Sequence, residues 1–366
     1  MDNYITQSKG RVEKSIISKE KRVELVNQVE EILGDKRWGW KASIDGFCAQ
    51  LETNSSHLYD FWVDNWFAMP KNIKSHVRIY GVIEPSLGKP HAYYNPETKT
   101  AIVHNTEYYG QIKSWALGEV CDFAEDQHDI HSIHGSCVEV NGDGIVLIAP
   151  TNTGKSTHSY ALVGMEGARL HSDDWLYVRF TRGEKGIPSA EISERNFYIR
   201  TNIKKVFPEV GPLLEKCKLE NVEPLTEEEI RKLREEGVRE SNITEMINDQ
   251  FIAHEYSRAM LDPRWIAGTE KFIDTTRVKK VLLLKRDKND PEIIRPLGVD
   301  DAVEYLLKQS EKFLNPYLIV SNPEKDEVRA NFFRRLFGVA PPYLVNTYEP
   351  VEKVQGRIRE LVKNRI

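Results

Sequence analysis

The stretch IVLIAPTNTGKSTHSYAL, at residues 145–162, constrains the fold more than any other part of the sequence. Its first residues form an apolar run typical of a buried strand, its middle is a short polar loop, and its last residues are typical of a helix. Such a loop points backbone N–H groups, together with those at the start of the helix, towards a bound anion. We therefore predict an α/β core with a phosphate-binding loop at residues 149–156.

The loop matches the pattern G-x-x-x-x-G-K-[ST], with Ala149 in place of the first glycine. Lys155 would reach the outer phosphates of a nucleotide, and the hydroxyl of Ser156 would help to hold Mg²⁺. Asn152 adopts a left-handed conformation more readily than most residues, so the missing glycines stiffen the loop without disabling it. We predict that a nucleotide is bound by Ala149, Thr151, Asn152, Thr153, Gly154, Lys155, Ser156 and Thr157.

An acidic pair, Asp173 and Asp174, lies in the sequence LHSDDWLYV, just before a predicted strand. Adjacent carboxylates can divide two tasks, because one can ligate Mg²⁺ while the other accepts the proton of an attacking hydroxyl. A solvated Asp-Asp turn is the alternative interpretation, but the preceding phosphate loop favours the functional one. We lean towards Asp173 as the base, although the sequence does not decide between the two.

Three histidines, at positions 128, 131 and 134, precede the loop. Their spacing would place them on alternating faces of a strand, and no cysteine or glutamate partner is adjacent, so a zinc site is not expected. The cysteines at 48, 121, 137 and 217 form no CxxC pair. We expect them to be reduced thiols of a cytoplasmic protein.

The composition is that of a folded globular chain, with 366 residues, 40% of them hydrophobic and 29% charged. A net charge of −5 argues against nucleic acid as the main partner, because binding to a phosphate backbone usually requires a basic excess. No apolar run approaches the roughly 20 residues of a membrane span, and the first residues show no secretory signal. We therefore expect neither a membrane nor a nucleic acid as a partner.

The rest of the chain divides into a mainly β N-terminal region, 1–125, and an α/β catalytic region, 126–366. A helix is predicted over 19–33, ending before Gly34, and short strands in HVRIYGVIE, HAYYN and TAIVHN. The segment SCVEVNGDGIVLIA predicts a hairpin with its turn at NGDG. Further predicted elements are a helix at 155–163, strands in DDWLYVRF, KKVLLLKRD and NPYLIVSN, and helices in VDDAVEYLLKQ and PVEKVQGRIRELVKN.

One charged helix is predicted in PLTEEEIRKLREEGVRE, between the strands of the second region. Thr226 and Glu229 have the spacing of a capping box. The pairs Glu227–Arg231 and Glu228–Lys232 have the spacing of ion pairs along one helix face. We interpret this segment as a solvated helix.

Three motifs together resemble the C-terminal catalytic domain of bacterial HPr kinase/phosphorylase. They are His134-Gly135, the stretch GDGIVLIAPTNTGKSTHSYAL, and LHSDDWLYV, in that order. ATP-dependent phosphoenolpyruvate carboxykinase shares this arrangement more distantly. The resemblance covers about residues 130–205, with weaker similarity to about residue 350, and implies a P-loop core of the carboxykinase and HPr kinase type. The N-terminal region does not resemble that of HPr kinase, so we expect an acceptor other than HPr.

The resemblance also implies roles for single residues. Gly154, Lys155, Ser156 and Thr157 would hold the β- and γ-phosphates and Mg²⁺, and His134 would orient or tune one of the two aspartates. In SERNFYIRTN, Glu194 would assist the metal and Arg200 would contact the transferred phosphate. Arg258 is a candidate for a second arginine. The catalytic set is then Asp173, Asp174, His134, Lys155 and Arg200, and the metal set is Ser156, Asp173, Asp174 and Glu194.

The sequence thus favours an ATP- and Mg²⁺-dependent kinase that transfers the γ-phosphoryl group to a hydroxyl. The acceptor would be a serine of a peptide or protein, or a small hydroxylated metabolite, and residues 1–125 would select it. Two alternatives stay open, a nucleotide-binding regulatory protein without phosphotransfer and a carboxykinase-like lyase. Association into a homo-oligomer also stays open.

Overall fold

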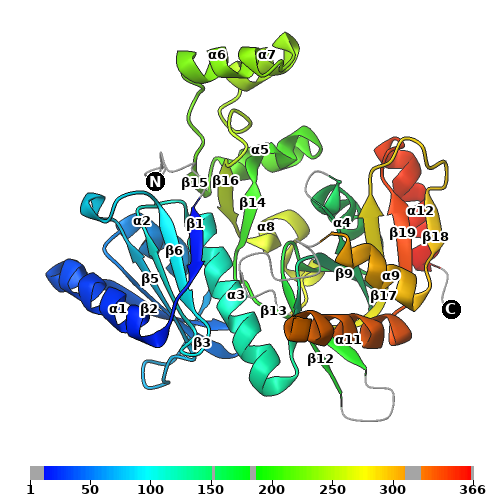
Figure 1. Cartoon of the computed structure of the whole chain (residues 1–366). Coiled ribbons are helices and arrows are strands. Elements are labelled where there is room, and N and C mark those ends of the chain that lie inside the picture. The colour runs from blue at the N-terminus through cyan, green and yellow to red at the C-terminus, as the bar shows by residue number, and fades with distance from the viewer. Residues whose placement is uncertain (1–11, 151–152, 182–186, 310–322, 364–366) are drawn as a thin grey trace.

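The chain is a mixed α/β protein with several sheets (Figure 1). Its structure, a computed structural model, describes residues 12–150, 153–181, 187–309 and 323–363. One large sheet is formed by the N-terminal half and another by the C-terminal half, and a small sheet lies between them. Short 3₁₀ helices occur at Gly34–Lys36, Pro85–Leu87, Thr201–Lys205, Pro208–Val210 and Thr269–Lys271.

The N-terminal sheet has the strand order β1-β6-β7-β5-β3-β2-β4. Helix α1 (Lys19–Leu33) packs on one face, and helices α2 (Ser56–Asn65) and α3 (Tyr109–His128) pack on the other. The strands are β1 (Glu13–Ile16), β2 (Trp38–Ile44), β3 (Phe47–Thr53), β4 (Phe67–Ala68), β5 (Val77–Val82), β6 (His91–Asn95) and β7 (Thr100–His104).

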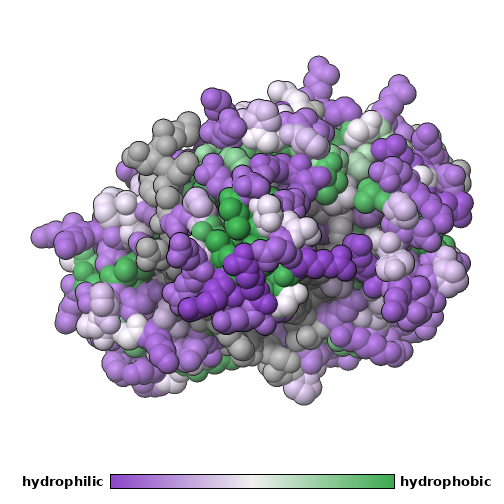
Figure 2. Space-filling view, turned by 90° about the horizontal axis from the view of Figure 1, so that it is seen from above, coloured by the Kyte–Doolittle hydropathy of each residue, from purple (hydrophilic) through white to green (hydrophobic). Residues whose placement is uncertain are grey.

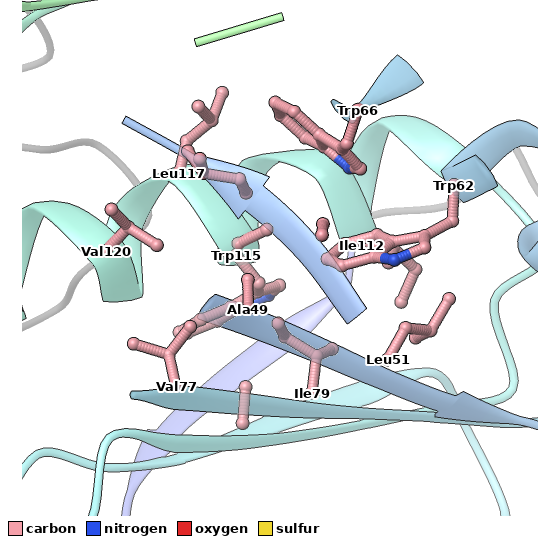
Figure 3. Close-up of a cluster of buried hydrophobic side chains, with 14 of the residues drawn as sticks. Ala49, Leu51, Trp62, Trp66, Val77, Ile79, Ile112, Trp115, Leu117 and Val120 are labelled. Atoms are coloured by element: carbon pink, nitrogen blue, oxygen red, sulfur yellow. The ribbon is translucent and has the colours of Figure 1, made fainter. Parts of the chain in front are cut away.

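Alternation of side chains along the central strand β5 explains why both faces are covered. Val77 and Ile79 belong to the core under α2 and α3, whereas Tyr80 and Val82 belong to the smaller core under α1. Figure 3 shows the first of these cores, where Ile112 and Trp115 of α3 lie near Ala49 and Ile79 of the strands. Leu117 and Val120 of α3 belong to the same cluster. Helix α3 is therefore fixed against the sheet by large buried side chains.

The C-terminal sheet has the order β11-β9-β10-β17-β13-β12-β8, and β19 pairs with both β17 and β18. Strands β10, β17 and β19 are parallel to one another. The strands are β8 (His131–Ile133), β9 (Ser136–Val140), β10 (Asp143–Ile148), β11 (Ala168–Ser172), β12 (Leu176–Phe180), β13 (Pro188–Ile192), β17 (Thr275–Lys285), β18 (Ile294–Pro296) and β19 (Pro342–Asn346).

Helices cover both faces of this second sheet. Helices α4 (Lys155–Val163) and α12 (Val351–Lys363) pack on one face, and α9 (Val299–Leu307) and α11 (Pro323–Val339) pack on the other. Strand β10 is buried on both sides, since Ile145 and Leu147 face the first pair of helices while Val146 and Ile148 face the second. Its continuous apolar sequence is that expected of a parallel strand covered on two faces.

The small sheet has the order β14-β16-β15, with strands β14 (Phe197–Arg200), β15 (Lys218–Glu220) and β16 (Arg258–Leu261). Helices α5 (Gly211–Leu214), α6 (Glu227–Glu235), α7 (Glu240–Asn248) and α8 (Pro263–Ala267) lie beside or between its strands in the chain. Helices α6 and α7 project from the rest of the molecule (Figure 1). Seen from above, the surface is mostly hydrophilic, with apolar residues in limited patches (Figure 2).

Most predicted elements are confirmed, including the β9–β10 hairpin, α9 and α12, and α1 and α4 have the predicted bounds. Strand β12 begins three residues later than predicted, and β17 begins four residues earlier. The hairpin turn consists of Asn141 and Gly142, which both have positive φ, as a two-residue type I′ turn requires. The capping box of Thr226 and Glu229 is also confirmed. The strand predicted in NPYLIVSN lies outside the described residues.

Two expectations were wrong. The mainly β region contains two further helices, and α3 alone runs over residues 109–128. Its buried residues surround much of the helix, so the sequence lacks the single apolar stripe by which a surface helix is recognised. In α6, Arg231 and Lys232 pair with glutamates that follow them, Glu235 and Glu236, and not with those that precede them. Exposed ion pairs contribute little to the free energy of folding, so the predicted and the observed pairings of these side chains differ little in stability.

Candidate functional site

A cavity of about 610 Å³ opens between the start of α4, the start of α3 and the small sheet. Three sequence motifs meet there, because the loop before α4, the acidic pair before β12 and the His-Gly step before β9 all contribute. The lining residues include Tyr108, Lys113, His134, Ala149, Gly154, Lys155, Ser156, Thr157, Asp173, Asp174, Tyr198, Arg200, Lys205, Tyr256, Arg258 and Arg286.

The loop is held in place at both of its described ends. Gly154 has φ +91° and precedes the first residue of α4, so this position favours glycine. Thr153 donates its hydroxyl to the carbonyl of Pro150 at 2.6 Å. The carbonyl of Thr153 in turn accepts from the hydroxyl of Thr347, just past β19, at 2.8 Å. Thr151 and Asn152 lie outside the described residues.

Lys155 and Ser156 contact the two aspartates directly. The ammonium of Lys155 lies 2.7 Å from Asp174 Oδ1 and donates to the backbone carbonyl of Asp173 at 2.5 Å. Ser156 Oγ donates to Asp173 Oδ1 at 3.0 Å. The loop and the acidic pair, which are separate in sequence, therefore form one polar cluster.

The two carboxyl groups have pKa values shifted in opposite directions. Burial raises the pKa of Asp173, and Lys155 offsets only part of that effect. Burial acts in the same direction on Asp174, but the charges of Lys155, Lys113 and His134 outweigh it and hold the pKa of Asp174 well below its usual value. Asp173 is thus the more basic carboxylate, and Asp174 is the more firmly ionised one.

His134 reaches the acidic pair, as the sequence predicts. Its Nε2 lies 3.3 Å from Asp174 Oδ1, and its ring lies against Trp175 with 5.4 Å between centroids. The following Gly135 passes close to strand β10, because a Cβ there would lie only 2.7 Å from the carbonyl oxygen of Leu147. A side chain at position 135 would push the His-Gly step away from the sheet, so the glycine is what allows His134 its position.

Lys113, on α3, is the main site residue that sequence reasoning missed. Its ammonium lies 3.0 Å from Glu194 Oε1 and 3.5 Å from Asp174 Oδ2, and the side chain is only 4% exposed. Asn65 also donates to Glu194, at 3.0 Å. Glu194 is therefore buried against Lys113 and Asn65, and it is not among the residues that line the cavity. The sequence around it, KSWALGEV, mixes apolar and polar residues and carries no clear signal that Lys113 is buried.

The two arginines singled out in the sequence, Arg200 and Arg258, come together in the small sheet. They are direct partners in the antiparallel pairing of β14 and β16, and both line the cavity. Burial and the charge of Arg258 lower the pKa of Arg200. The guanidinium of Arg258 lies 5.9 Å from the ring centroid of Tyr198.

The oxygen ligands near the loop fit Mg²⁺ better than a metal that prefers nitrogen or sulfur. Ser156 and the two aspartates offer hydroxyl and carboxylate oxygens at one end of the cavity. No group of three or more His, Cys, Asp or Glu side chains suited to a metal occurs among the described residues. This donor set fits a Mg²⁺ ion that takes the remainder of its ligands from water and phosphate.

The other two histidines that precede the loop, and the four cysteines, lie away from the lining of the cavity and make structural contacts. His131 lies between Glu125 and Asp129, and His128 lies against the ring of Phe47. All four cysteines are free and buried. In the part of the chain that is described, no helix is both long enough and apolar enough to cross a membrane.

Comparison with known proteins gives little further information. No family model and no curated protein matches the chain. Solved structures do match, among them the Hpr(Ser) kinase/phosphatase from Coxiella burnetii, with 12% sequence identity and a TM-score of 0.31. That match covers 63% of this chain and 95% of the other. A TM-score this low carries no argument, so function has to be inferred from the residues of the site.

Proposed function

We propose that the chain binds ATP with Mg²⁺ at residues 149–157 and transfers the γ-phosphoryl group to the hydroxyl of an acceptor. One observation supports this most: Lys155, Ser156, both aspartates and His134 converge in one cavity at the start of α4. A lysine, a hydroxyl and an acidic pair at a helix start are the parts that phosphoryl transfer requires.

In the proposed reaction, Lys155 and the first N–H groups of α4 bind the phosphates of the nucleotide. Mg²⁺, when bound through Ser156 and Asp174, would neutralise charge on the phosphates. Asp173 accepts the proton of the acceptor hydroxyl, since its raised pKa makes it the better base. The acceptor oxygen forms a bond to the γ-phosphorus as the bond to the bridging oxygen breaks, and ADP leaves with that electron pair.

The remaining charged residues support this arrangement. Lys155, Lys113 and His134 together hold the pKa of Asp174 well below its usual value. Glu194 is paired with Lys113 at 3.0 Å, so we assign it to positioning that lysine and keep direct metal binding for Ser156 and Asp174. Residues of the N-terminal half reach the cavity through Tyr108 and Lys113, which is consistent with their selecting the acceptor.

The test measures ADP formation from ATP with and without hydroxyl compounds, in wild type, Lys155→Met and Lys308→Met. Lys308 is an exposed lysine directly after α9, paired with Glu304 and outside the cavity, so it controls for the loss of a positive charge. We expect acceptor-dependent ADP formation that Lys155→Met abolishes and Lys308→Met leaves intact. Nucleotide binding without ADP formation from any acceptor would instead favour the regulatory protein, and oxaloacetate dependence would favour the lyase.

A further inference from the structure

We propose that Arg200 and Arg258 form a subsite for an anionic group of the acceptor, so that the acceptor is a small hydroxylated molecule carrying a carboxylate or a phosphate. This inference rests on the proposed function and narrows the acceptor class within the same cavity. It arises from the cross-strand pairing of the two arginines, which the sequence does not show.

The first argument is the juxtaposition of like charges. Arg200 and Arg258 lie directly opposite each other on β14 and β16. Side chains in such positions have Cβ atoms about 4.5–5.5 Å apart, and like charges there are unfavourable. Both residues are half-buried rather than fully solvated, and Arg258 contributes to lowering the pKa of Arg200. A bound anion between the two guanidinium groups would relieve this repulsion.

The second argument is the way in which Arg258 is held. Its Nη1 donates to the backbone carbonyls of Glu255 and Ser257, at 2.9 Å and 3.0 Å. These neutral acceptors orient the guanidinium without cancelling its charge. Among the described residues, no carboxylate forms an ion pair with Arg258. The planar fork of an arginine fixed in this way matches a carboxylate or a phosphate.

The third argument separates this subsite from the nucleotide phosphates. Those phosphates are assigned to Lys155 and the start of α4, whereas the two arginines belong to strands β14 and β16 of the small sheet and reach the same cavity from there. Near the arginines the wall is aromatic, with Tyr108 packed edge-on against Tyr256 at 5.7 Å between centroids. Both arginines still lie close enough to Asp174 to feel its charge, which opposes the lowering of the Arg200 pKa and adds to the raising of the Arg258 pKa. An anion held there would therefore place its own hydroxyl near the acidic pair.

The fourth argument concerns size. A cavity of about 610 Å³ falls in the range typical of small-molecule sites. The lining also carries more basic side chains than its two aspartates can neutralise. Lys205 and Arg286 line the cavity in addition to the two arginines. These observations favour a small anion over a neutral alcohol or a neutral serine peptide.

The experiment compares matched acceptors that differ in charge: glycerol with glycerate and with glycerol 3-phosphate, glucose with glucose 6-phosphate, and a neutral serine peptide. ADP formation is measured for each, and binding of the anions to the protein with a non-hydrolysable ATP analogue is measured by calorimetry. We expect that an anionic compound binds and is turned over while its neutral counterpart is not. Glycerate and the phosphates distinguish a carboxylate subsite from a phosphate subsite.

Variants then test the arginines themselves. Arg258→Gln and Arg200→Gln should each raise the KM for the anionic acceptor about 10–100-fold, the loss expected for a charged hydrogen bond, with nucleotide affinity within about twofold. Arg258→Lys should recover part of the affinity. Arg264→Gln, which changes an exposed arginine paired with Asp262, is the matched control and should behave as wild type. Because the two arginines lie on separate strands, one variant still tests the subsite if the other fails to fold.

Several results would overturn the proposal. Equal use of neutral and anionic acceptors would do so, as would failure of every anion to bind. An increase in nucleotide Kd as large as the increase in KM would assign the arginines to ATP instead. Failure of the proposed function has a different signature: anions would bind in a manner dependent on Arg258, but the ATP analogue would not bind at all.

Discussion

Lys113 of helix α3 lies 3.5 Å from Asp174, so the N-terminal half of the chain supplies a cation to the acidic pair of the C-terminal half. The same ammonium lies 3.0 Å from the buried Glu194. The site is therefore assembled from both halves, and its charge balance depends on a residue far from the loop in sequence.

Replacing Lys113 by Met should destabilise the protein and impair turnover. The change leaves Glu194 buried without its cation, which typically costs about 3–5 kcal/mol. The double variant Lys113→Met/Glu194→Gln should recover much of the stability but not the activity, because Asp174 still lacks one of its cations. Urea unfolding and ADP formation measure the two effects separately. Equal recovery of both would reduce Lys113 to a structural role.

The two aspartates should respond differently to replacement by Asn. Asp173→Asn should lower the chemical rate by about 10²–10⁴-fold, the usual effect of a lost general base. Asp174→Asn should mainly increase the Mg²⁺ concentration needed for half-maximal rate. Initial rates over a Mg²⁺ series distinguish the two. The reverse pattern would exchange their roles, and two unaffected variants would make the pair a solvated turn.

His134→Ala should shift the pH profile of turnover while leaving nucleotide affinity nearly unchanged. His134 is one of the groups that depress the pKa of Asp174, so its removal raises that pKa. Because Asp174 must be ionised to hold Mg²⁺, the acid limb measured at limiting Mg²⁺ should move to higher pH. Lys155 and Lys113 remain, so the shift should be modest. A profile identical to wild type would show that His134 does not tune the pair.

A separate pH effect is expected on stability. Glu125 is buried, and although burial opposes it, Arg329 at 2.6 Å and His131 lower its pKa to about 2. The folded pKa lies below the unfolded value of 4.5, so this stabilisation is complete above the unfolded pKa. It is lost as pH falls towards 2, and by linkage it amounts to about 3 kcal/mol.

Glu125→Gln should remove that part of the pH dependence. Unfolding free energies measured in urea between pH 5 and pH 3 should fall less steeply for the variant than for wild type. Glu360→Gln, at an exposed position on α12, is the control and should keep the wild-type slope. An unchanged slope in Glu125→Gln would contradict the assignment.

The parts of the site that the sequence predicted are those determined locally. The apolar run of β10, the turn at Asn141 and Gly142, and the start of α4 follow from neighbouring residues. The position of His134 near the acidic pair was expected from the resemblance to HPr kinase, and its nitrogen does lie 3.3 Å from Asp174.

The parts that could not be predicted depend on pairing between distant segments. Arg200 and Arg258 were separate candidates, and only the register of β14 and β16 makes them neighbours. Lys113 resembled any surface lysine until α3 was found to be buried on several sides. The position of Glu194 behind Lys113 depends on the same helix, so its role could not be assigned from its place in the chain.

The most direct test of the proposed reaction follows the γ-phosphoryl group itself. The protein is incubated with Mg²⁺, ATP labelled at the γ-phosphate and the acceptors compared above, and the products are separated. We predict that the label leaves ATP and becomes covalently attached to the acceptor, and that Asp173→Asn slows this transfer strongly. Label found only in ATP, or only in inorganic phosphate whatever acceptor is present, would contradict the account.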